Sequence, residues 1–426
     1  DGCITCKMSN DKGIRTTKHM AWGHGPIVAS LEGLFSLGDK TDIYPDTPDT
    51  PPKYRDHSIF MMINGIFALI FIGFFAILYA MNIGSANASA EKIIKNGRFP
   101  TWQESKNDVS QNSFATIGIS PSIIMICVFS IIPLLFSAFI AFTNYSSPSH
   151  LPPNNLVEWV GLESFQQMFS STGVGGGSNA WATSFGWAAI WTIVWAVFAT
   201  FTCFFVGFFY AFVLQDKRII IPTFFRTVFI LPYAIPTMLS LFVWANLFNG
   251  TIGPINEMFK MIGLPTVKWL SDPWIAKGTL IFVNIWIGFP YSMILTTSSM
   301  TAISNSLYEA AVIDGATKWQ QFKNITYPLV MFQLKPTLIM QFAGNINNFG
   351  AVYFLTGGGP NLPGVGLTSE TSCGATDILI SWIYKLTMNT MKYNLASVLS
   401  LLVFVVLVPF ALYNFTRTKS FKEGAV

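Results

Sequence analysis

Long apolar runs alternate with short polar segments along most of the 426-residue chain. Each run is long enough to cross the ~30 Å hydrocarbon core of a bilayer as a helix. The runs do not alternate apolar and polar residues, which favours helices over the strands of a barrel. The seven predicted spans are approximately Ile59–Ile83, Ile117–Phe142, Ser184–Leu214, Pro222–Phe248, Ile275–Met300, Phe332–Thr356 and Leu395–Phe415. The fold class predicted from this pattern is an all-α polytopic membrane protein.

Composition supports a membrane protein. Hydrophobic residues make up 51% of the chain and charged residues only 11%, whereas a soluble domain carries about 25% charged residues. The net charge of +4 gives no basis for nucleic-acid binding. Residues 1–57 are polar and are predicted to be irregular, and the Asp- and Pro-rich part from 39 to 52 predicts an extended loop.

Clusters of Lys and Arg residues lie in alternate loops, which predicts the orientation of the chain. They comprise Lys92, Lys95, Arg98 and Lys106 between spans one and two, Lys217, Arg218 and Arg226 between three and four, Lys318, Lys323 and Lys335 in and beyond the segment between five and six, and Arg417, Lys419 and Lys422 after span seven. The loop from 143 to 182, between spans two and three, contains none. The positive-inside rule places the basic loops in the cytoplasm. We therefore expect a multi-pass protein of the bacterial cytoplasmic membrane.

The polar segment Ser304–Pro328 separates spans five and six, on the predicted cytoplasmic side. Capping-box spacing, which starts helices, occurs in it twice, in the pairs Ser306 with Glu309 and Thr317 with Gln320. Gly315 lies between the pairs, where a helix commonly ends in a left-handed residue. The segment therefore predicts helix, sharp bend, helix. Such a unit could dock into another protein, and an ordinary capped surface loop would show the same spacing.

Polar side chains recur inside three of the apolar spans. Such groups are costly in lipid unless they are satisfied, so their positions are informative. They are Tyr233, Thr237, Ser240 and Trp244 in span four, Asn284, Gly288 and Tyr291 in span five, and Gln341, Asn345 and Asn348 in span six. Each set has the spacing of one helical face. Helix-to-helix hydrogen bonding explains any single amide, and the combined set favours a hydrated cavity that suits a sugar.

Acidic and basic residues are absent from the middle of spans two to seven. Ion-coupled carriers often need a carboxylate there, so the pattern favours an uncharged solute and an external energy source. The chain has no Walker A sequence, because neither Gly173–Gly177 nor Gly357–Gly359 is followed by Lys-Ser or Lys-Thr. A lone Cys3-Ile-Thr-Cys6 pair does not predict a metal site. We expect no cofactor on this chain and, if ATP drives transport, a separate ATP-binding polypeptide.

The segment Ser304–Pro328 resembles the EAA motif of membrane subunits of ABC importers. The matching positions are Glu309, Ala310, Ala311, Gly315, Ile325 and Pro328, and Asp314 lies within the same motif. In that family the motif is a coupling helix seated in a cleft of a cytoplasmic ATPase. Tyr327 departs from the pattern, which more often has Leu at this position.

Further stretches are similar to MalF-type permeases of maltose and maltodextrin importers. They include Phe229–Ala234, Gly288–Tyr291, Asn345–Phe349, Leu355–Pro360 and Thr376–Leu379, and the resemblance covers about residues 117–420. It implies a type I importer permease fold and a sugar site formed by Gly288, Tyr291, Asn345 and Asn348. Asn284 and Gln341 complete the candidate site by their polarity and spacing.

The resemblance also implies partners. They are a second permease of the MalG type, two ATPase subunits of the MalK or MsmK type that carry ATP and Mg, and an extracellular sugar-binding protein. Membrane lipid surrounds the chain, and an oligosaccharide crosses the membrane by alternating access. Two departures are the short outer loop 143–182, where enterobacterial members have a folded insertion, and Gly344, where some relatives have an aromatic ring.

We expect three regions along the chain: a polar segment at 1–57, a first helix with a basic linker at 58–116, and a permease domain at 117–420 that contains 304–328. Related permeases begin in the cytoplasm, so we expect one more N-terminal span, which either precedes residue 1 or is not recognisable in the sequence. Another oligosaccharide, such as raffinose or a β-linked one, is an open alternative. An ion-coupled carrier or a membrane enzyme would need the intramembrane carboxylate or His cluster that the spans lack.

Overall fold

The computed structural model describes residues 7–10, 13–16, 26–38, 58–97, 99, 101–103, 118–152, 156–170, 180–216, 218–362 and 371–416. The chain forms two compact units. Unit 1 comprises Asp1–Phe165 and Met391–Val398, and unit 2 comprises Gln166–Thr390 and Leu399–Val426.

Unit 1 is organised around the first two membrane spans. Its elements are the antiparallel hairpin of β1 (Lys7–Asn10) and β2 (Gly13–Thr16), α1 (Pro26–Phe35), α2 (Ser58–Asn96), and a span at Gly118–Ile140 that contains the π-turn η2 (Cys127–Ile131) and α4 (Ile132–Ile140). The prediction that residues 1–57 are irregular is therefore wrong for the hairpin and for α1. The stretch 39–57, including its predicted extended loop, lies outside the described residues.

Helix α1 forms because its apolar residues have a partner far along the chain. Leu34 and Leu37 are buried in one cluster with Met62 and Ile66 of α2 and Ile140 of α4. This packing compensates for the short length of α1, which has only ten residues and would be marginal alone.

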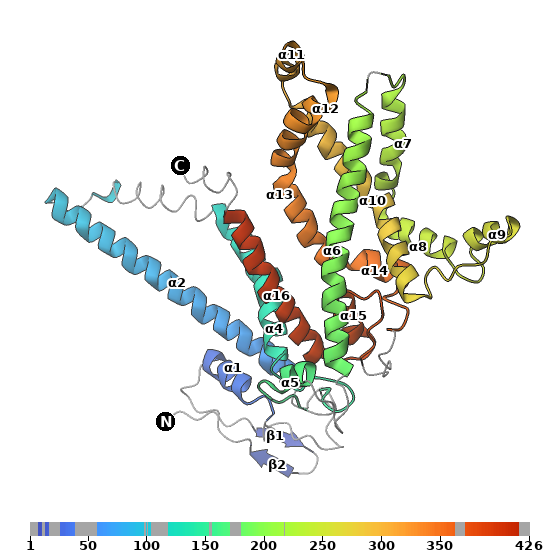
Figure 1. The fold of residues 1–426 in the computed structure, drawn as a ribbon. Helices are drawn as coiled ribbons and strands as arrows, with labels where there is room; N and C mark the ends of the chain where they lie inside the picture. Colours follow the sequence, from blue (N-terminus) through green and yellow to red (C-terminus); the bar gives the residue numbers. More distant parts are fainter. Residues whose placement is uncertain are drawn as a thin grey trace. The chain divides into compact units, whose positions relative to one another are not determined.

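Unit 2 contains most of the candidate site. Its elements are α6 (Ala180–Val213), α7 (Pro222–Ala234), α8 (Thr237–Leu247), α9 (Pro254–Met261), α10 (Pro273–Thr301), α11 (Asn305–Ile313), α12 (Lys318–Gln321), the π-turn η3 (Phe322–Thr326), α13 (Tyr327–Ile346), α14 (Phe349–Thr356) and α15 (Leu379–Met388). Helices α5 (Glu163–Phe169) and α16 (Tyr393–Thr416) each begin in unit 1 and end in unit 2. In Figure 1, α6, α10 and α13 run side by side, with α11 and α12 beyond one end of them.

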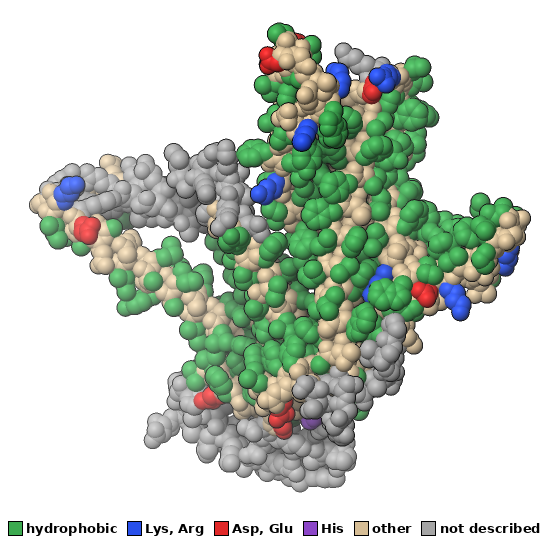
Figure 2. All heavy atoms as spheres, viewed as in Figure 1, with side chains coloured by type: hydrophobic (Ala, Val, Ile, Leu, Met, Phe, Trp, Pro, Cys, Tyr) green, Lys and Arg blue, Asp and Glu red, His purple; other side chains and the backbone are tan. Residues whose placement is uncertain are grey.

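Five helices among the described residues are long and apolar enough to span a membrane, and α7 with α8 adds a sixth candidate bent by 89°. The stretch predicted as span six is α13 followed by α14, with a break at Asn347 and Asn348. Figure 2 shows hydrophobic side chains over much of the visible face of unit 2, as a lipid-facing surface requires.

The bend between α7 and α8 has a local cause. Ile235 is extended (ψ 135°) and precedes Pro236, which disfavours the helical conformation of its neighbour. Tyr233 therefore lies on a different helix from Thr237, Ser240 and Trp244. The prediction that these four share one helical face is wrong.

Helices α6 and α10 pack closely through small residues. A Cβ atom added at Gly207 of α6 would lie 2.6 Å from the backbone of Phe289 and Met293, and one added at Gly288 of α10 would lie 2.8 Å from Cys203 Sγ. Small residues let helix backbones approach in membranes, where van der Waals contact drives association. Gly288 is thus required for packing, in addition to any contact with a substrate.

Replacing Gly207 by Val should separate α6 from α10, because the new side chain meets backbone atoms that cannot move aside. We expect a loss of roughly 1–3 kcal/mol in stability, as for other overpacked cores. Thermal unfolding of the detergent-purified protein measures it. Gly186→Val on the same helix is the control, because nothing lies within 4 Å of its added Cβ. Equal melting temperatures for the two variants would contradict the close packing.

Candidate functional site

The segment Ser304–Pro328 forms two short helices joined by a bend, as predicted. The N-cap of α11 is Ser304, and Ser306 lies inside the helix, so the predicted Ser306–Glu309 capping box is wrong. The helix starts two residues earlier than expected because Ser304 takes an extended conformation (ψ 132°), while no side chain caps α11. Glu309 is therefore not needed to cap α11 and is exposed.

The bend and the second helix start are confirmed. Gly315 has φ +76°, the left-handed conformation that favours glycine. Thr317 Oγ1 accepts a hydrogen bond from Gln320 N at 3.3 Å, and Gln320 Oε1 accepts one from Thr317 N at 2.7 Å. Asp314 occupies the C-cap of α11. The two helices are therefore held in a defined relative orientation.

One side of this segment is anchored to the membrane helices. Tyr308 OH and Thr326 Oγ1 are 2.9 Å apart, which ties α11 to η3. Tyr308 and Ile325 pack against a buried cluster that includes Phe204 and Phe208 of α6. These contacts attach α11 to η3 and to α6.

The other side of the segment is exposed and largely apolar. Ile313 is 85% exposed, Trp319 68% and Val312 60%, and Glu309 and Ala310 are exposed beside them while Ala311 is half-buried. Such a patch, with one acidic group, on a polar segment outside the predicted spans has the composition of a protein-interaction surface.

Asn345 and Asn348 meet at the break between α13 and α14. Asn348 is the N-cap of α14 and lies beyond the end of α13, so the prediction that it shares a helical face with Gln341 and Asn345 is wrong. The chain break nevertheless brings the two amides together, with Asn348 Nδ2 3.4 Å from Asn345 Oδ1.

Helix α6 supports this amide pair. Trp195 Nε1 donates to the carbonyl of Asn345 at 3.1 Å, and Asn345 Nδ2 donates to Thr200 Oγ1 at 3.0 Å. Asn348 Oδ1 accepts from Ala351 N at 3.3 Å. Each amide nitrogen carries a second hydrogen beyond these bonds, so both can still donate to a hydroxyl group.

The other candidate residues occupy neighbouring positions. Asn284 and Gly288 face Cys203 of α6, with Asn284 Nδ2 3.3 Å from Cys203 Sγ. Tyr291 stacks on Tyr233 of α7, at 5.9 Å between ring centroids and 28° between planes. The rings of Tyr291 and Tyr233 connect α10 to the end of α7, just before the bend.

Gln341 lies in a small gap between α6, α10 and α13. It shares this gap with Phe204, Ser292, Leu334 and Thr337. Ser292 Oγ is buried with no protein partner among the described residues. The gap is too narrow for a sugar ring and is of the size that holds a water molecule.

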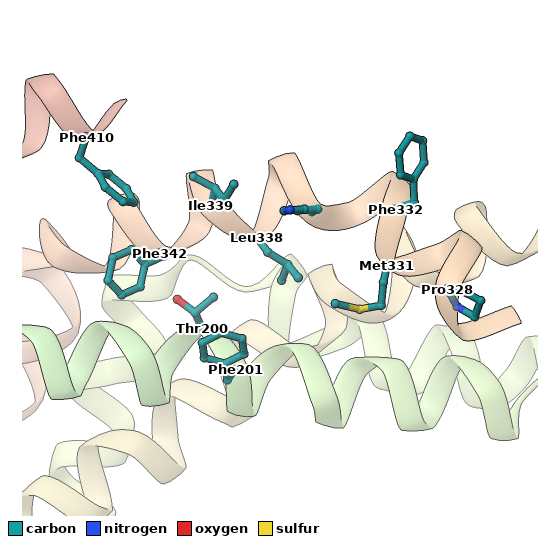
Figure 3. Close-up of a pocket in the computed structure, with 10 residues that line it drawn as sticks. Thr200, Phe201, Pro328, Met331, Phe332, Leu338, Ile339, Phe342 and Phe410 are labelled. Atoms are coloured by element: carbon teal, nitrogen blue, oxygen red, sulfur yellow. The ribbon is translucent and has the colours of Figure 1, made fainter. Parts of the chain in front are cut away.

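A cavity of about 590 Å³ in unit 2 lies between α6, α13 and α16. Figure 3 shows Thr200 and Phe201 of α6 facing Leu338 and Phe342 of α13. Its lining is almost wholly apolar, so it does not have the hydroxyl-binding groups of a sugar site. It does not include Asn284, Gly288, Tyr291, Gln341, Asn345 or Asn348.

The structure adds a buried ion pair that the sequence did not single out. Lys385 Nζ lies 2.6 Å from Asp377 Oδ2, and their side chains are 12% and 0% exposed. Gly374 N and Ser381 Oγ also donate to Asp377, at 2.7 and 2.8 Å. An added Cβ at Gly358 (φ +77°) would overlap the Asp377 carboxylate.

Two of the stretches that carry the family resemblance meet beside this ion pair. Leu355–Pro360 and Thr376–Leu379 are joined, because Thr376 N donates to the carbonyl of Gly358 at 3.2 Å. Burial raises the pKa of Asp377 above its ordinary value, and the Lys385 ammonium and the hydrogen bonds oppose the shift.

Thr200, Cys203 and Trp195 are further residues of the site that the sequence analysis did not identify. Each is an ordinary residue on a helix face, and nothing in its spacing distinguishes it.

The fold and these sites define a multi-pass permease subunit of an ABC importer. Residues 204–419 match the family described as "Binding-protein-dependent transport system inner membrane component". The chain belongs to this family. It is a transport subunit that functions with a binding protein, and the family's ATP hydrolysis is carried out by a separate ATPase.

Named relatives are sugar permeases. The chain is 34% identical over 398 residues to the galactooligosaccharides permease GanP of Bacillus subtilis, covering 92% of this chain and 88% of GanP. It is 35% identical over 401 residues to the maltodextrin permease MalC of Streptococcus pneumoniae, covering 92% and 86%. The maltose/maltodextrin permease MalF of Vibrio parahaemolyticus is 39% identical over 217 residues, which is 50% of this chain and 41% of MalF.

A solved structure shares the fold. It is a bacterial ABC transporter for import of the acidic polysaccharide alginate, with a TM-score of 0.57 and 20% identity. The similarity covers 74% of this chain and 99% of that one. The importer permease fold predicted from the sequence is confirmed.

Replacing Lys385 by Met should leave the buried Asp377 carboxylate without its ion-pair partner. This should lower the free energy of unfolding by about 3–5 kcal/mol near neutral pH. Without the ammonium the pKa of Asp377 rises further, so the folded state favours the protonated carboxyl. The Lys385→Met variant should therefore be most stable at low pH, and its free energy of unfolding should fall as pH rises through the folded-state pKa of Asp377. The variant should melt higher at about pH 5 than at about pH 8.

Two controls accompany this measurement. Asp377→Asn with Lys385→Met should remove the pH dependence, because no ionisable pair remains. Lys260→Met breaks the exposed pair with Glu257 and should change stability by at most about 1 kcal/mol. A Lys385→Met protein that melts like the wild type at both pH values would show that the pair contributes nothing.

Proposed function

We propose that this permease subunit imports maltodextrin-type oligosaccharides by alternating access, driven by ATPase subunits docked at Ser304–Pro328. The observation that carries the proposal is the physical connection between two features of unit 2. The exposed coupling segment continues directly through η3 into α13, and α13 ends at the Asn345–Asn348 amide pair.

The amide pair and the tyrosines support a sugar as the solute. Asn345 and Asn348 each keep a donor hydrogen, and amides pair well with the hydroxyl groups of a sugar. Tyr291 and Tyr233 offer aromatic faces on which the apolar face of a pyranose can stack. Asn284, Gly288 and Gln341 surround these groups from α10 and α13, and we assign them to the shape of the pocket.

The exposed surface of α11 and α12 supports the coupling role. Glu309 presents a carboxylate beside Val312, Ile313 and Trp319, which together form a compact patch of mixed chemistry. We propose that Glu309, Ala310, Ala311, Asp314 and Gly315 seat in the ATPase, and that Ile325 and Pro328 transmit its movement to α13. ATP and Mg would then bind only to the ATPase chains.

The proposed setting is the bacterial cytoplasmic membrane. The partners would be a second permease of the MalG type, two ATPases of the MalK or MsmK type and an extracellular binding protein. Relatives described as maltodextrin and maltose permeases favour an α-glucan as the solute. A galactooligosaccharide is the second candidate, because GanP is similar to the chain over nearly its whole length.

Reversing the charge at Glu309, as Glu309→Lys, should weaken docking and reduce sugar-stimulated ATP hydrolysis of the reconstituted transporter by about tenfold or more, since a lost interfacial charge contact costs roughly 2 kcal/mol. Glu257→Lys makes the same charge change at an exposed position of α9 and should leave the rate unchanged. Undiminished stimulation in Glu309→Lys would remove the segment from the docking surface.

Removing the amide of Asn348 tests the sugar site without uncapping α14. Asn348→Ser keeps a side-chain oxygen that can accept from Ala351 N, and it replaces the two amide hydrogens by one hydroxyl hydrogen that lies one bond closer to the backbone and cannot reach the same sugar hydroxyl. We expect uptake of radiolabelled maltotriose to fall by about tenfold, because a site built to bond a hydroxyl loses roughly 1.5 kcal/mol or more with each donor. Tyr291→Ala should act in the same direction through loss of stacking.

Asn347→Ser is the matched control, since Asn347 is exposed at the C-cap of α13. Assembly is followed by copurification of the partner subunits. If Asn348→Ser and Tyr291→Ala assemble and transport at wild-type rates, neither residue binds the sugar.

A further inference from the structure

The cavity between α6, α13 and α16 has no role in the sugar pathway proposed above. Its volume of about 590 Å³ is that of a ligand site. Lys335 is the charged residue of its lining, and Thr200 is the other polar one. Thr200 already accepts a hydrogen bond from Asn345. The cavity therefore offers apolar walls and a single cation.

This lining excludes a sugar as the occupant. Each sugar hydroxyl that leaves water without a partner costs free energy, and the walls are made by side chains such as Phe201, Met331 and Phe342. Figure 3 shows these side chains directed into the cavity from α6 and α13. An apolar chain with one negative charge is the complementary ligand.

The length of the cavity fits one leaflet of the bilayer. Its lining runs along α13 from Pro328 to Phe342, fourteen residue-to-residue steps, or about 21 Å at ~1.5 Å per residue. Half of a bilayer that is ~40–45 Å thick with its headgroups has the same length. A lipid tail can therefore lie along the groove with its headgroup near Pro328.

The position of Lys335 supports this placement. Helical side chains tilt towards the N-terminus, which for α13 is the end joined to the coupling segment. Lysines in spans extend their ammonium group towards the headgroups in this way. Lys335 itself is exposed rather than enclosed by protein. It lies seven residues from Pro328 along α13, or about 10 Å at ~1.5 Å per residue, so its ammonium extends towards a phosphate that enters the groove from that end.

We propose that this cavity binds one anionic phospholipid of the cytoplasmic leaflet, with its acyl chain among Phe201, Leu338 and Phe410 and its phosphate on Lys335. The assignment of the leaflet rests on the orientation in the proposed function. Basic pockets between membrane helices on the cytoplasmic side bind anionic headgroups by the same chemistry.

The lipid would touch both ends of the coupling path. Pro328, the last residue of the coupling segment, is at one end of the groove, and Thr200, which holds Asn345, is in its wall. The acyl chain thus fills the space between α13 and its neighbours while leaving α13 free to slide. An acyl chain suits this position because it makes no directional bonds that movement would break.

Native mass spectrometry of the purified full transporter tests the site, with titrations of phosphatidylglycerol and of phosphatidylcholine. We expect a bound phosphatidylglycerol that Lys335→Gln weakens by about fivefold, the contribution of one lysine near a membrane surface. Lys335→Arg should retain it. Ile339→Trp should fill the groove and abolish binding of the lipid.

The controls are Lys323→Gln, an exposed lysine of η3 outside the lining, and Leu329→Trp, an exposed α13 position outside it; both should bind lipid normally. Equal binding by the wild type, Lys335→Gln and Ile339→Trp would overturn the proposal. So would photocrosslinking from position 339 that yields an adduct with the second permease and none with lipid. Wild-type ATP hydrolysis stimulated by maltotriose is recorded in the same preparation, so failure of the proposed function is seen separately.

Discussion

Backbone groups freed where membrane helices break must find partners inside the protein, because the hydrocarbon core offers none. Unit 2 has such a break between α13 and α14, and α6 supplies what it needs. Trp195 donates a further hydrogen bond to the carbonyl of Asn345, which also accepts from Asn348 N at 3.2 Å, Thr200 accepts from the Asn345 side chain, and Asn348 caps α14. The polar edge of α6 therefore makes a broken span tolerable at the depth where a polar solute has to pass.

The same helix ties the break to the cytoplasmic segment. Gly207, and Cys203 against Gly288, bring α6 and α10 into close contact, and Phe204 and Phe208 of α6 pack under Tyr308 and Ile325. The coupling segment and the amide pair are thus attached to one scaffold at different levels. In the proposed alternating access, this shared scaffold would link movement of the segment to the amide pair.

Local chemistry could be predicted well from the sequence. The left-handed Gly315 and the Thr317–Gln320 capping box depend on residues within a few positions of one another, and both are present. The Ser306 cap was wrong because the N-cap of α11 is Ser304, without any side-chain cap, although only Ser306 has a Glu three residues on. The shared face of Gln341, Asn345 and Asn348 was wrong because helical spacing assumes an unbroken helix.

The amino-acid sequence by itself determined that the chain is a helical membrane protein, which loops are basic, and where the coupling segment lies, since these follow from hydropathy, charge and local caps. Only the tertiary structure decided which polar groups pair. Asn284 meets Cys203 across 81 positions and Asn345 meets Thr200 across 145. The spacing of polar residues shows which face of a helix is polar but does not show which residue each of them bonds. Those hydrogen-bond partners depend on how helices that are distant in the chain pack together.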